Sequence, residues 1–210
     1  MWPEAEQTGK FLKAAEAGDG AARDQLLERH RESVKRMIEL RLDRRLLQRV
    51  DASDIVQDVL LEAHRRLAGY FENPSMPFHL WLRQLAQDRI IDMHRRHRVA
   101  QRRSLDREQS LSPAWVEQSS LNLGAQLEDD QLTPAAENLR REMAELLLKA
   151  VDQLDESDHE IILMRHFEQL ENQEVAELLG LTPAAAGMRH LRALRRLKDH
   201  LSPPDSSDEA

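Results

Sequence analysis

The chain has 210 residues, of which 32% are charged and 4% aromatic, and only 7 are glycine. Segments that alternate as strands do are hard to find, so the composition predicts an all-α protein with modest cores. The absence of cysteine excludes disulfides and cysteine-based zinc sites. No apolar run approaches the ~20 residues that span a membrane, and residues 1–4 lack the features of a secretion signal, so we expect a cytoplasmic protein.

The net charge of -8 argues at first against nucleic acid as a partner, but the charges are unevenly distributed. Residues 83–103 contain seven arginines and two aspartates, and residues 187–198 contain five basic residues and no acid. Residues 104–160 between them contain fourteen acidic and four basic residues. Two basic segments separated by an acidic one are able to bind DNA at two places, although two solvated helix faces would give the same pattern.

The first half of the chain shows helical spacing of its apolar residues, broken by turn signals at residues 18–20 and 69–77. The spacing predicts four helices, over residues 10–17, 21–42, 52–67 and 78–98. Asp51 precedes the third helix as an N-cap, and Asp54 lies in its positively polarised first turn.

The second half begins with residues 104–132, which lack periodicity and are rich in Ser, Gln and Asp. Such a segment is typical of a flexible linker, which a protease should cut first. Helix-start signals at Thr133, Asp155 and Thr182 and a turn at Gly180 then predict four more helices, over residues 134–154, 156–167, 171–179 and 183–200. The fold class is therefore all-α, with two small helical domains joined by a flexible linker, the second ending in a helix-turn-helix.

The helix that starts near Asp54 carries an unusual leucine. Residues 55, 56, 59, 60, 63 and 67 form a normal core stripe, while the opposite side presents Asp54, Gln57, Asp58, Leu61 and Arg65. A lone exposed leucine is common in proteins and needs no function. An apolar side chain ringed by carboxylates is equally typical of a docking face for a basic partner helix.

The helix over residues 78–98 has an apolar arc and a cationic one. Trp81 lies at the edge of the apolar arc, where it either packs in the core or stacks on an unpaired base. Arg89 and Asp92 are three residues apart, so we expect them to form an ion pair. The other arc suits phosphates and bases, and it presents Arg83, Gln84, Gln87, His94, Arg95 and Arg98.

Residues 171–197 fit a helix, a tight turn and a second helix. Gly180 supplies the turn, because positive φ is easy for glycine. Small residues at the start of the second helix would let it approach the major groove of DNA closely, and four arginines follow at positions 189, 192, 195 and 196.

Three stretches resemble a known family. Residues 51–67 (DASDIVQDVLLEAHRRL) resemble the polymerase-docking helix of bacterial sigma factors, and residues 78–96 resemble the promoter-melting helix that follows it. Residues 154–201 are similar to the family's fourth region. The resemblance covers residues 10–103 and 134–201, and the missing first and third regions point to the two-domain, extracytoplasmic-function type.

The resemblance implies a factor that binds core RNA polymerase and directs promoter-specific transcription initiation. Region 2 would span residues 8–103, a linker 104–133, region 4 residues 134–201 and a disordered tail 202–210. The β′ clamp helices would meet Asp54, Gln57, Asp58 and Leu61. The -10 element would meet Asn73, His79, Trp81, Gln84, Asp88, Arg95 and Arg98. The -35 element would meet Ala184, Ala185, Met188, Arg189, Arg192, Arg195 and Arg196.

Two positions depart from the family pattern, since the family often has Asn in place of Asp88 and a basic residue in place of Gly187. The resemblance also implies the β flap as a polymerase contact and leaves open an anti-sigma factor or another regulator as a partner. It implies no cofactor, no metal, no catalytic residue and no insertion in a membrane.

Two other classes of function are alternatives to a sigma factor. A helix-turn-helix regulator that is not a polymerase subunit would explain the last helices, but not the acid-ringed Leu61. A helical adaptor that only binds other proteins is the second alternative. An enzyme is disfavoured, because His159 and His166 lack a matching third metal ligand and no glycine-rich phosphate loop is present.

Overall fold

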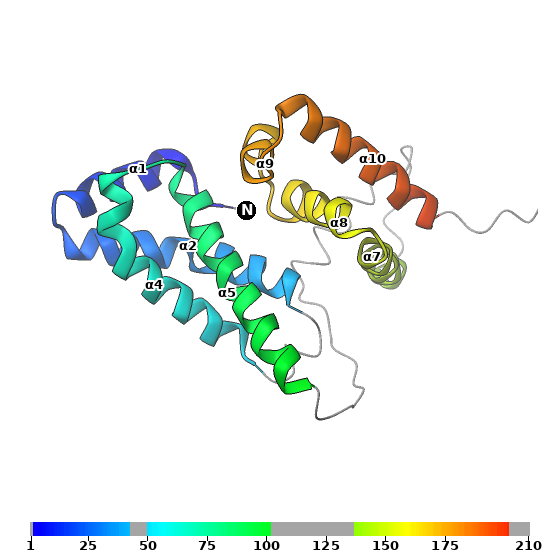
Figure 1. Cartoon of the computed structure of the whole chain (residues 1–210), viewed down its shortest axis with the longest axis horizontal. Coiled ribbons are helices and arrows are strands. Elements are labelled where there is room, and N and C mark those ends of the chain that lie inside the picture. Colours follow the sequence, from blue (N-terminus) through cyan, green and yellow to red (C-terminus); the bar gives the residue numbers. More distant parts are fainter. Residues whose placement is uncertain (1, 43–49, 102–136, 202–210) are drawn as a thin grey trace, which may run out of the picture. The chain divides into compact units, whose positions relative to one another are not determined.

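A computed structural model describes residues 2–42, 50–101 and 137–201 of the chain. The predicted linker, the cap at Thr133 and the predicted tail therefore lie outside the described residues. The fold is all-α, with no β-strand in the described ranges. It divides into two compact units, one holding α1 to α5 and the other α7 to α10 (Figure 1). None of the described helices is long and apolar enough to cross a lipid bilayer.

Within residues 2–42 and 50–101, the first unit packs three long helices and one shorter helix around a single core. Its helices are α1 (Ala5–Glu16), α2 (Gly20–Arg41), α4 (Ala52–Glu72) and α5 (Phe78–Gln101). Helix α2 contacts the other three, and α4 lies along α5. The core contains the predicted stripe of α4, which is buried at Ile55, Val56, Val59, Leu60, Ala63 and Leu67.

Three of these helices are longer than the sequence predicts, and α5 runs to Gln101 rather than to residue 98. Helix α1 begins at Ala5 rather than Lys10, and buried Thr8 donates its hydroxyl to the Glu4 carbonyl at 2.9 Å. Helix α4 runs on to Glu72, so the loop before α5 is shorter than the predicted 69–77. The buried ring of Tyr70 packs on α5 and outweighs the ~1 kcal/mol that helical Gly69 costs.

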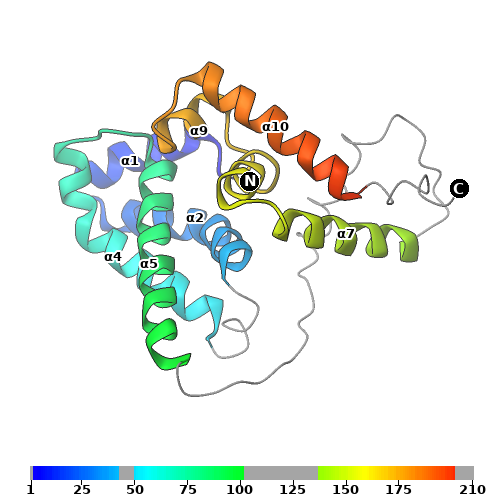
Figure 2. The same cartoon turned by 45° about the vertical axis from the view of Figure 1, so that its right-hand side comes forward.

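In the described residues 137–201, the second unit contains α7 (Glu137–Asp152), α8 (Glu156–Ile162), a π-helical turn (Leu163–Phe167), α9 (Asn172–Leu178) and α10 (Pro183–Leu201). Figure 2 shows α10 spanning the other helices of this unit, and it contacts α7, α8 and α9. Its buried side is lined by Ala186, Ala193 and Leu197. The predicted cap at Asp155 is confirmed, because its carboxylate accepts from the backbone N–H groups of Ser157 and Asp158. These bonds, the one from Asp158 foremost, lower the pKa of Asp155.

Candidate functional site

The outer face of α4 combines acidic and apolar side chains. Asp54, Gln57 and Asp58 are exposed, and Leu61 beside them keeps 51% of its surface exposed. The cap at Asp51 fixes where the helix begins, since its carboxylate accepts from the Ser53 N–H at 2.8 Å. The face therefore presents an uncovered leucine within a ring of polar and acidic groups, as the spacing predicts.

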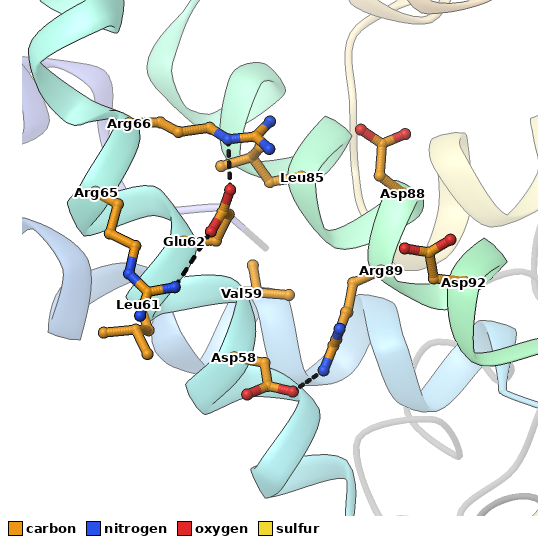
Figure 3. Close-up of a pocket in the computed structure, with 10 residues that line it drawn as sticks. All are labelled: Asp58, Val59, Leu61, Glu62, Arg65, Arg66, Leu85, Asp88, Arg89 and Asp92. Atoms are coloured by element: carbon orange, nitrogen blue, oxygen red, sulfur yellow. Dashed lines mark hydrogen bonds and ion pairs between the residues drawn. The ribbon is translucent and has the colours of Figure 1, made fainter. Parts of the chain in front are cut away.

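A hollow of about 430 Å³ adjoins this face, between α4 and α5. Figure 3 shows its lining residues, which are Asp58, Val59, Leu61, Glu62, Arg65, Arg66, Leu85, Asp88, Arg89 and Asp92. On its α4 side, the Glu62 carboxylate bridges two arginines, with oxygen–nitrogen distances of 2.6 Å to Arg66 and 3.7 Å to Arg65. The hollow is thus lined by paired charges around the edge of Leu61.

The predicted ion pair between Arg89 and Asp92 is wrong. Arg89 of α5 instead reaches across the hollow to Asp58 of α4 (Figure 3), and Asp92 pairs with Arg95 at 3.2 Å. Because α4 and α5 lie side by side, the Asp58 carboxylate on α4 is within reach of Arg89, as Asp92 one turn along α5 is. This arrangement ties Asp58, a predicted polymerase contact, to the helix predicted to melt DNA.

An aromatic cluster supports the start of α5. The rings of Tyr70, Phe78 and Trp81 lie with centroids 5.0 to 5.5 Å apart, and Trp81 is half-buried against the core. The Tyr70 hydroxyl donates to the Met76 carbonyl at 3.0 Å and so holds the loop that precedes α5. Burial raises the pKa of this hydroxyl. Trp81 is therefore a partly exposed aromatic packed against the core, and its stacking on an unpaired base stays a prediction.

The remaining predicted residues of this region lie mostly at the surface. Gln84, Asp88 and Arg95 are exposed on α5, Asn73 is exposed in the loop and His79 is half-buried. The side chain of Arg98 lies outside the described residues. One expectation is wrong: Arg83, placed on the cationic arc, is 4% exposed, because α2 and α4 both pack on α5 and widen its buried side.

The second unit contains a helix-turn-helix formed by α9 and α10. Gly180 adopts a φ of 63°, a conformation that favours glycine, and the Leu181 N–H donates to the Ala176 carbonyl at 2.8 Å. The Thr182 hydroxyl caps α10 by accepting from the Ala185 N–H at 3.2 Å. The Asn172 amide donates to the Pro183 carbonyl at 2.8 Å and fixes the start of α9 against the start of α10.

Helix α10 exposes most of the residues predicted to read DNA. Ala184, Met188, Arg192 and Arg195 are exposed, and Ala185 and Arg189 are partly exposed. Arg196 is exposed too, but its guanidinium is held by Asp155 and, at 2.5 Å, by Asp158, both at the start of α8. Because that pair braces α10 against α8, Arg196 has a structural role that its spacing did not predict.

Removing this brace should destabilise the second unit. We expect Arg196→Ala to lower the free energy of unfolding by about 1–2 kcal/mol, because the Asp158 carboxylate, 4% exposed, loses its charged partner while half-exposed Arg196 limits the loss. Thermal unfolding followed by circular dichroism measures the effect, and Arg195→Ala, an exposed arginine of the same helix, is the matched control. Equal melting of the two variants would contradict the brace.

Two family models match the chain in the order of these two units. One, described as Sigma-70 region 2, matches residues 26–99, and the other, described as Sigma-70, region 4, matches residues 144–197. Together they cover more than half of the chain. The chain belongs to the sigma-70 family. It is a sigma factor of the extracytoplasmic-function type, and it directs transcription initiation.

The similar proteins are themselves named RNA polymerase sigma factors. It is 31% identical over 150 residues to the probable RNA polymerase sigma factor RfaY of Xanthomonas campestris pv. campestris, an alignment that covers 71% of this chain and 34% of RfaY. The chain thus spans about a third of the length of that relative. It is 28% identical over 201 residues to the ECF RNA polymerase sigma factor SigD of Mycobacterium tuberculosis, covering 96% of this chain and 87% of SigD.

A solved structure shows the same fold. The structure of CnrH in complex with the cytosolic domain of CnrY is 21% identical in sequence, with a TM-score of 0.55, and covers 91% of this sigma factor and 94% of that chain.

Several contacts of this sigma factor could not be derived from spacing along a helix. The pairs Arg89–Asp58 and Arg196–Asp158 each join two helices, as does the contact between His166 and His190, whose Nε2 atoms lie 2.8 Å apart. Each predicted helix is present in the described residues, some with different ends, but the sequence does not say which helix faces meet.

Proposed function

We propose that this sigma factor binds core RNA polymerase through the outer face of α4 and reads promoter DNA with α5 and α10. The carrying observation is Leu61, 51% exposed among Asp54, Gln57 and Asp58. Burial of this leucine against a partner provides binding energy, and the surrounding carboxylates favour a partner with a basic surface. The β′ clamp helices are the proposed partner there, and the β flap is the proposed partner of the second unit. The relatives named above, themselves called RNA polymerase sigma factors, support this assignment.

The proposed -10 surface comprises the loop before α5 and the exposed side of that helix. Its members are Asn73, His79, Trp81, Gln84, Asp88, Arg95 and Arg98. Arginines there neutralise phosphates of the melted strand, and the accessible edge of Trp81 stacks on an unpaired base. The Arg89–Asp58 pair couples this surface to the docking face, because it links the two helices that carry them.

The proposed -35 surface is the exposed side of α10. The residues that would enter or flank the major groove are Ala184, Ala185, Met188, Arg189, Arg192 and Arg195. Small side chains at the start of the helix allow a close approach, and the arginines behind them reach phosphates and base edges. We assign Arg196 to the brace with Asp158 rather than to a base contact.

We propose that the sigma factor has no catalytic activity of its own, works in the cytoplasm and uses no cofactor or metal. No group of three or more His, Asp or Glu side chains that suits a metal ion is present in the described part of the chain. An anti-sigma factor or another regulator is a further proposed partner.

The two DNA-reading helices should fail in different ways. We expect Arg192→Ala to weaken binding of the holoenzyme to upstream duplex about tenfold, as the loss of one arginine contact implies. We expect Trp81→Ala to spare duplex binding but to reduce strand opening about fivefold, since the stacked base is lost.

Footprinting of a promoter by the reconstituted holoenzyme separates these effects, with DNase for the duplex and permanganate for unpaired thymines. Promoters come from the 5′ ends of transcripts that rise after overexpression. Normal thymine reactivity with Trp81→Ala would contradict the stacking role. A holoenzyme that starts transcription at none of these promoters would contradict the proposed function itself.

A further inference from the structure

Trp2, which precedes α1 and lies outside residues 26–99 of the family match, forms part of an aromatic cluster. The indole of Trp2 is half-buried, with its centroid 5.8 Å from the ring of His79 and 6.3 Å from the ring of His30. His79 lies in the first turn of α5 and His30 in α2. Trp2 therefore covers a place where α2 meets the start of α5.

Beneath Trp2 lies a buried histidine, His30, whose ring has a hydrogen-bond acceptor with no donor in the described residues. His30 is fully buried and packs edge-on against Phe78, with ring centroids 5.1 Å apart. Its Nδ1 lies 2.8 Å from the Leu26 carbonyl, and a carbonyl only accepts, so Nδ1 carries the proton and donates. Nε2 then bears a lone pair, and no group in the described residues donates to it.

Burial keeps this ring neutral. Burial foremost, together with the nearby charges of His79 and Arg29, lowers the pKa of His30 to about 4. At neutral pH the Nε2 atom is therefore a hydrogen-bond acceptor that receives no donor from the described part of the chain. A buried polar atom in this condition costs free energy, which a ligand with an N–H group would recover.

The indole that covers the cluster is easy to move. Only Pro3 and Glu4 separate Trp2 from the first residue of α1, so a swing of two residues removes it without unfolding a helix. The flat indole lies against the rings of both His79 and His30, where an unstacked base could take its place. His79 also belongs to the proposed -10 surface.

We propose that Trp2, His30 and His79 form a binding site for one unpaired nucleobase with an exocyclic amino group, which Trp2 closes in the free sigma factor. The base displaces the indole, stacks on His79 and donates an amino hydrogen to Nε2 of His30. The inference rests on the proposed function, because it assigns one base of the melted strand to this site. It adds two residues, Trp2 and His30, to the surface that reads that strand.

The test compares single-stranded oligonucleotides that differ only in the amino group. The two probes are dA12 and a 12-mer of deoxynebularine, whose base is purine without the amino group. Their binding to the sigma factor in complex with core polymerase is measured by fluorescence anisotropy. The signal that core polymerase gives by itself is subtracted. We expect Trp2→Ala to tighten dA12 binding about fivefold, which corresponds to ~1 kcal/mol of displaced stacking. Gln7→Ala, an exposed change on α1, should leave both affinities as they are.

The second variant tests the acceptor. His30→Phe keeps the packing against Phe78 but has no lone pair, so dA12 and the purine oligomer should then bind equally. Weaker dA12 binding by Trp2→Ala would overturn the proposal, because the indole would then contact the bound base instead of blocking its site. Unchanged binding by Trp2→Ala, or a preference for dA12 that survives His30→Phe, would overturn it as well.

A third measurement does not depend on the folding of the His30 variant. In a chain with Trp81→Phe and Trp115→Phe, Trp2 is the only tryptophan. We expect its emission to shift to longer wavelength when dA12 binds, because the indole leaves a half-buried place for water. An unshifted spectrum at saturation would overturn the displacement. Promoter transcription measured in parallel distinguishes this outcome from a failure of the proposed function.

Discussion

The double substitution Asp54→Ala and Leu61→Ala is expected to weaken binding to core RNA polymerase about thirtyfold, which corresponds to ~2 kcal/mol. Both side chains are exposed, so neither contributes much to the stability of the unit. The loss arises at the interface, where the partner loses an apolar contact and a carboxylate that faces its basic side chains. A titration of labelled core polymerase with the variant measures the affinity.

A matched control is available in the same unit. Ile91 of α5 is 55% exposed, close to the 51% of Leu61, and no role is assigned to it. In the absence of DNA, Ile91→Ala should therefore bind core polymerase as the unaltered chain does. If the docking double variant keeps its helix content by circular dichroism and also keeps its affinity, the α4 face is not the docking surface.

The carboxylate of Asp58 couples the docking face to α5. Asp58 is shared between the Arg89 side chain and the proposed polymerase contact, so the partner must compete for this carboxylate. The internal pair keeps α4 and α5 in register before the polymerase arrives. The face is therefore preorganised, and part of its charge is already satisfied within the unit.

The helices themselves could be predicted because local signals specify them. Asp51, Asp155 and Thr182 cap helices where the sequence places them, and Gly180 turns the chain where positive φ is needed. The ends of α1 and α4 could not be predicted, because tertiary packing of Thr8 and Tyr70 extends the helices beyond their local signals.

The site was predictable in outline and not in its pairings. Leu61 is exposed as the helical spacing implies, since the opposite stripe of α4 fills the core. Spacing along one helix favoured Arg89 with Asp92 and an exposed Arg83, and both expectations failed because α5 is packed by two other helices. The roles of the polymerase and DNA contacts remain predictions.

Acid should destabilise the second unit through two histidines that face each other. The Nε2 atoms of His166 and His190 lie 2.8 Å apart, so one neutral ring donates to the other. Burial, the neighbouring imidazole and Arg165 lower the pKa of His166 from 6.5 to about 4, and burial followed by Arg165 lowers that of His190. A second proton between these rings would leave two donors face to face.

The direction of the pH effect follows from these pKa values. Above pH 6.5 His166 is neutral in the folded and the unfolded chain, so it adds no pH dependence. Between pH 6.5 and 4 the unfolded chain binds a proton that the folded chain refuses, which favours unfolding. We therefore expect the free energy of unfolding to fall by about 3 kcal/mol as the pH drops through this window, and to level off below pH 4.

Urea unfolding at pH 7.5 and pH 4.5, followed by histidine NMR signals, measures this loss and the pKa of His166 together. His166→Gln is the informative variant, because its amide still bonds with His190 but cannot take a proton. It should lose markedly less stability between the two pH values than the unaltered chain, whereas His200→Gln, an exposed histidine at the end of α10, should lose as much. A His166 signal that titrates near pH 6.5 would show that the two rings separate in solution, and the structural role of the pair would then be wrong.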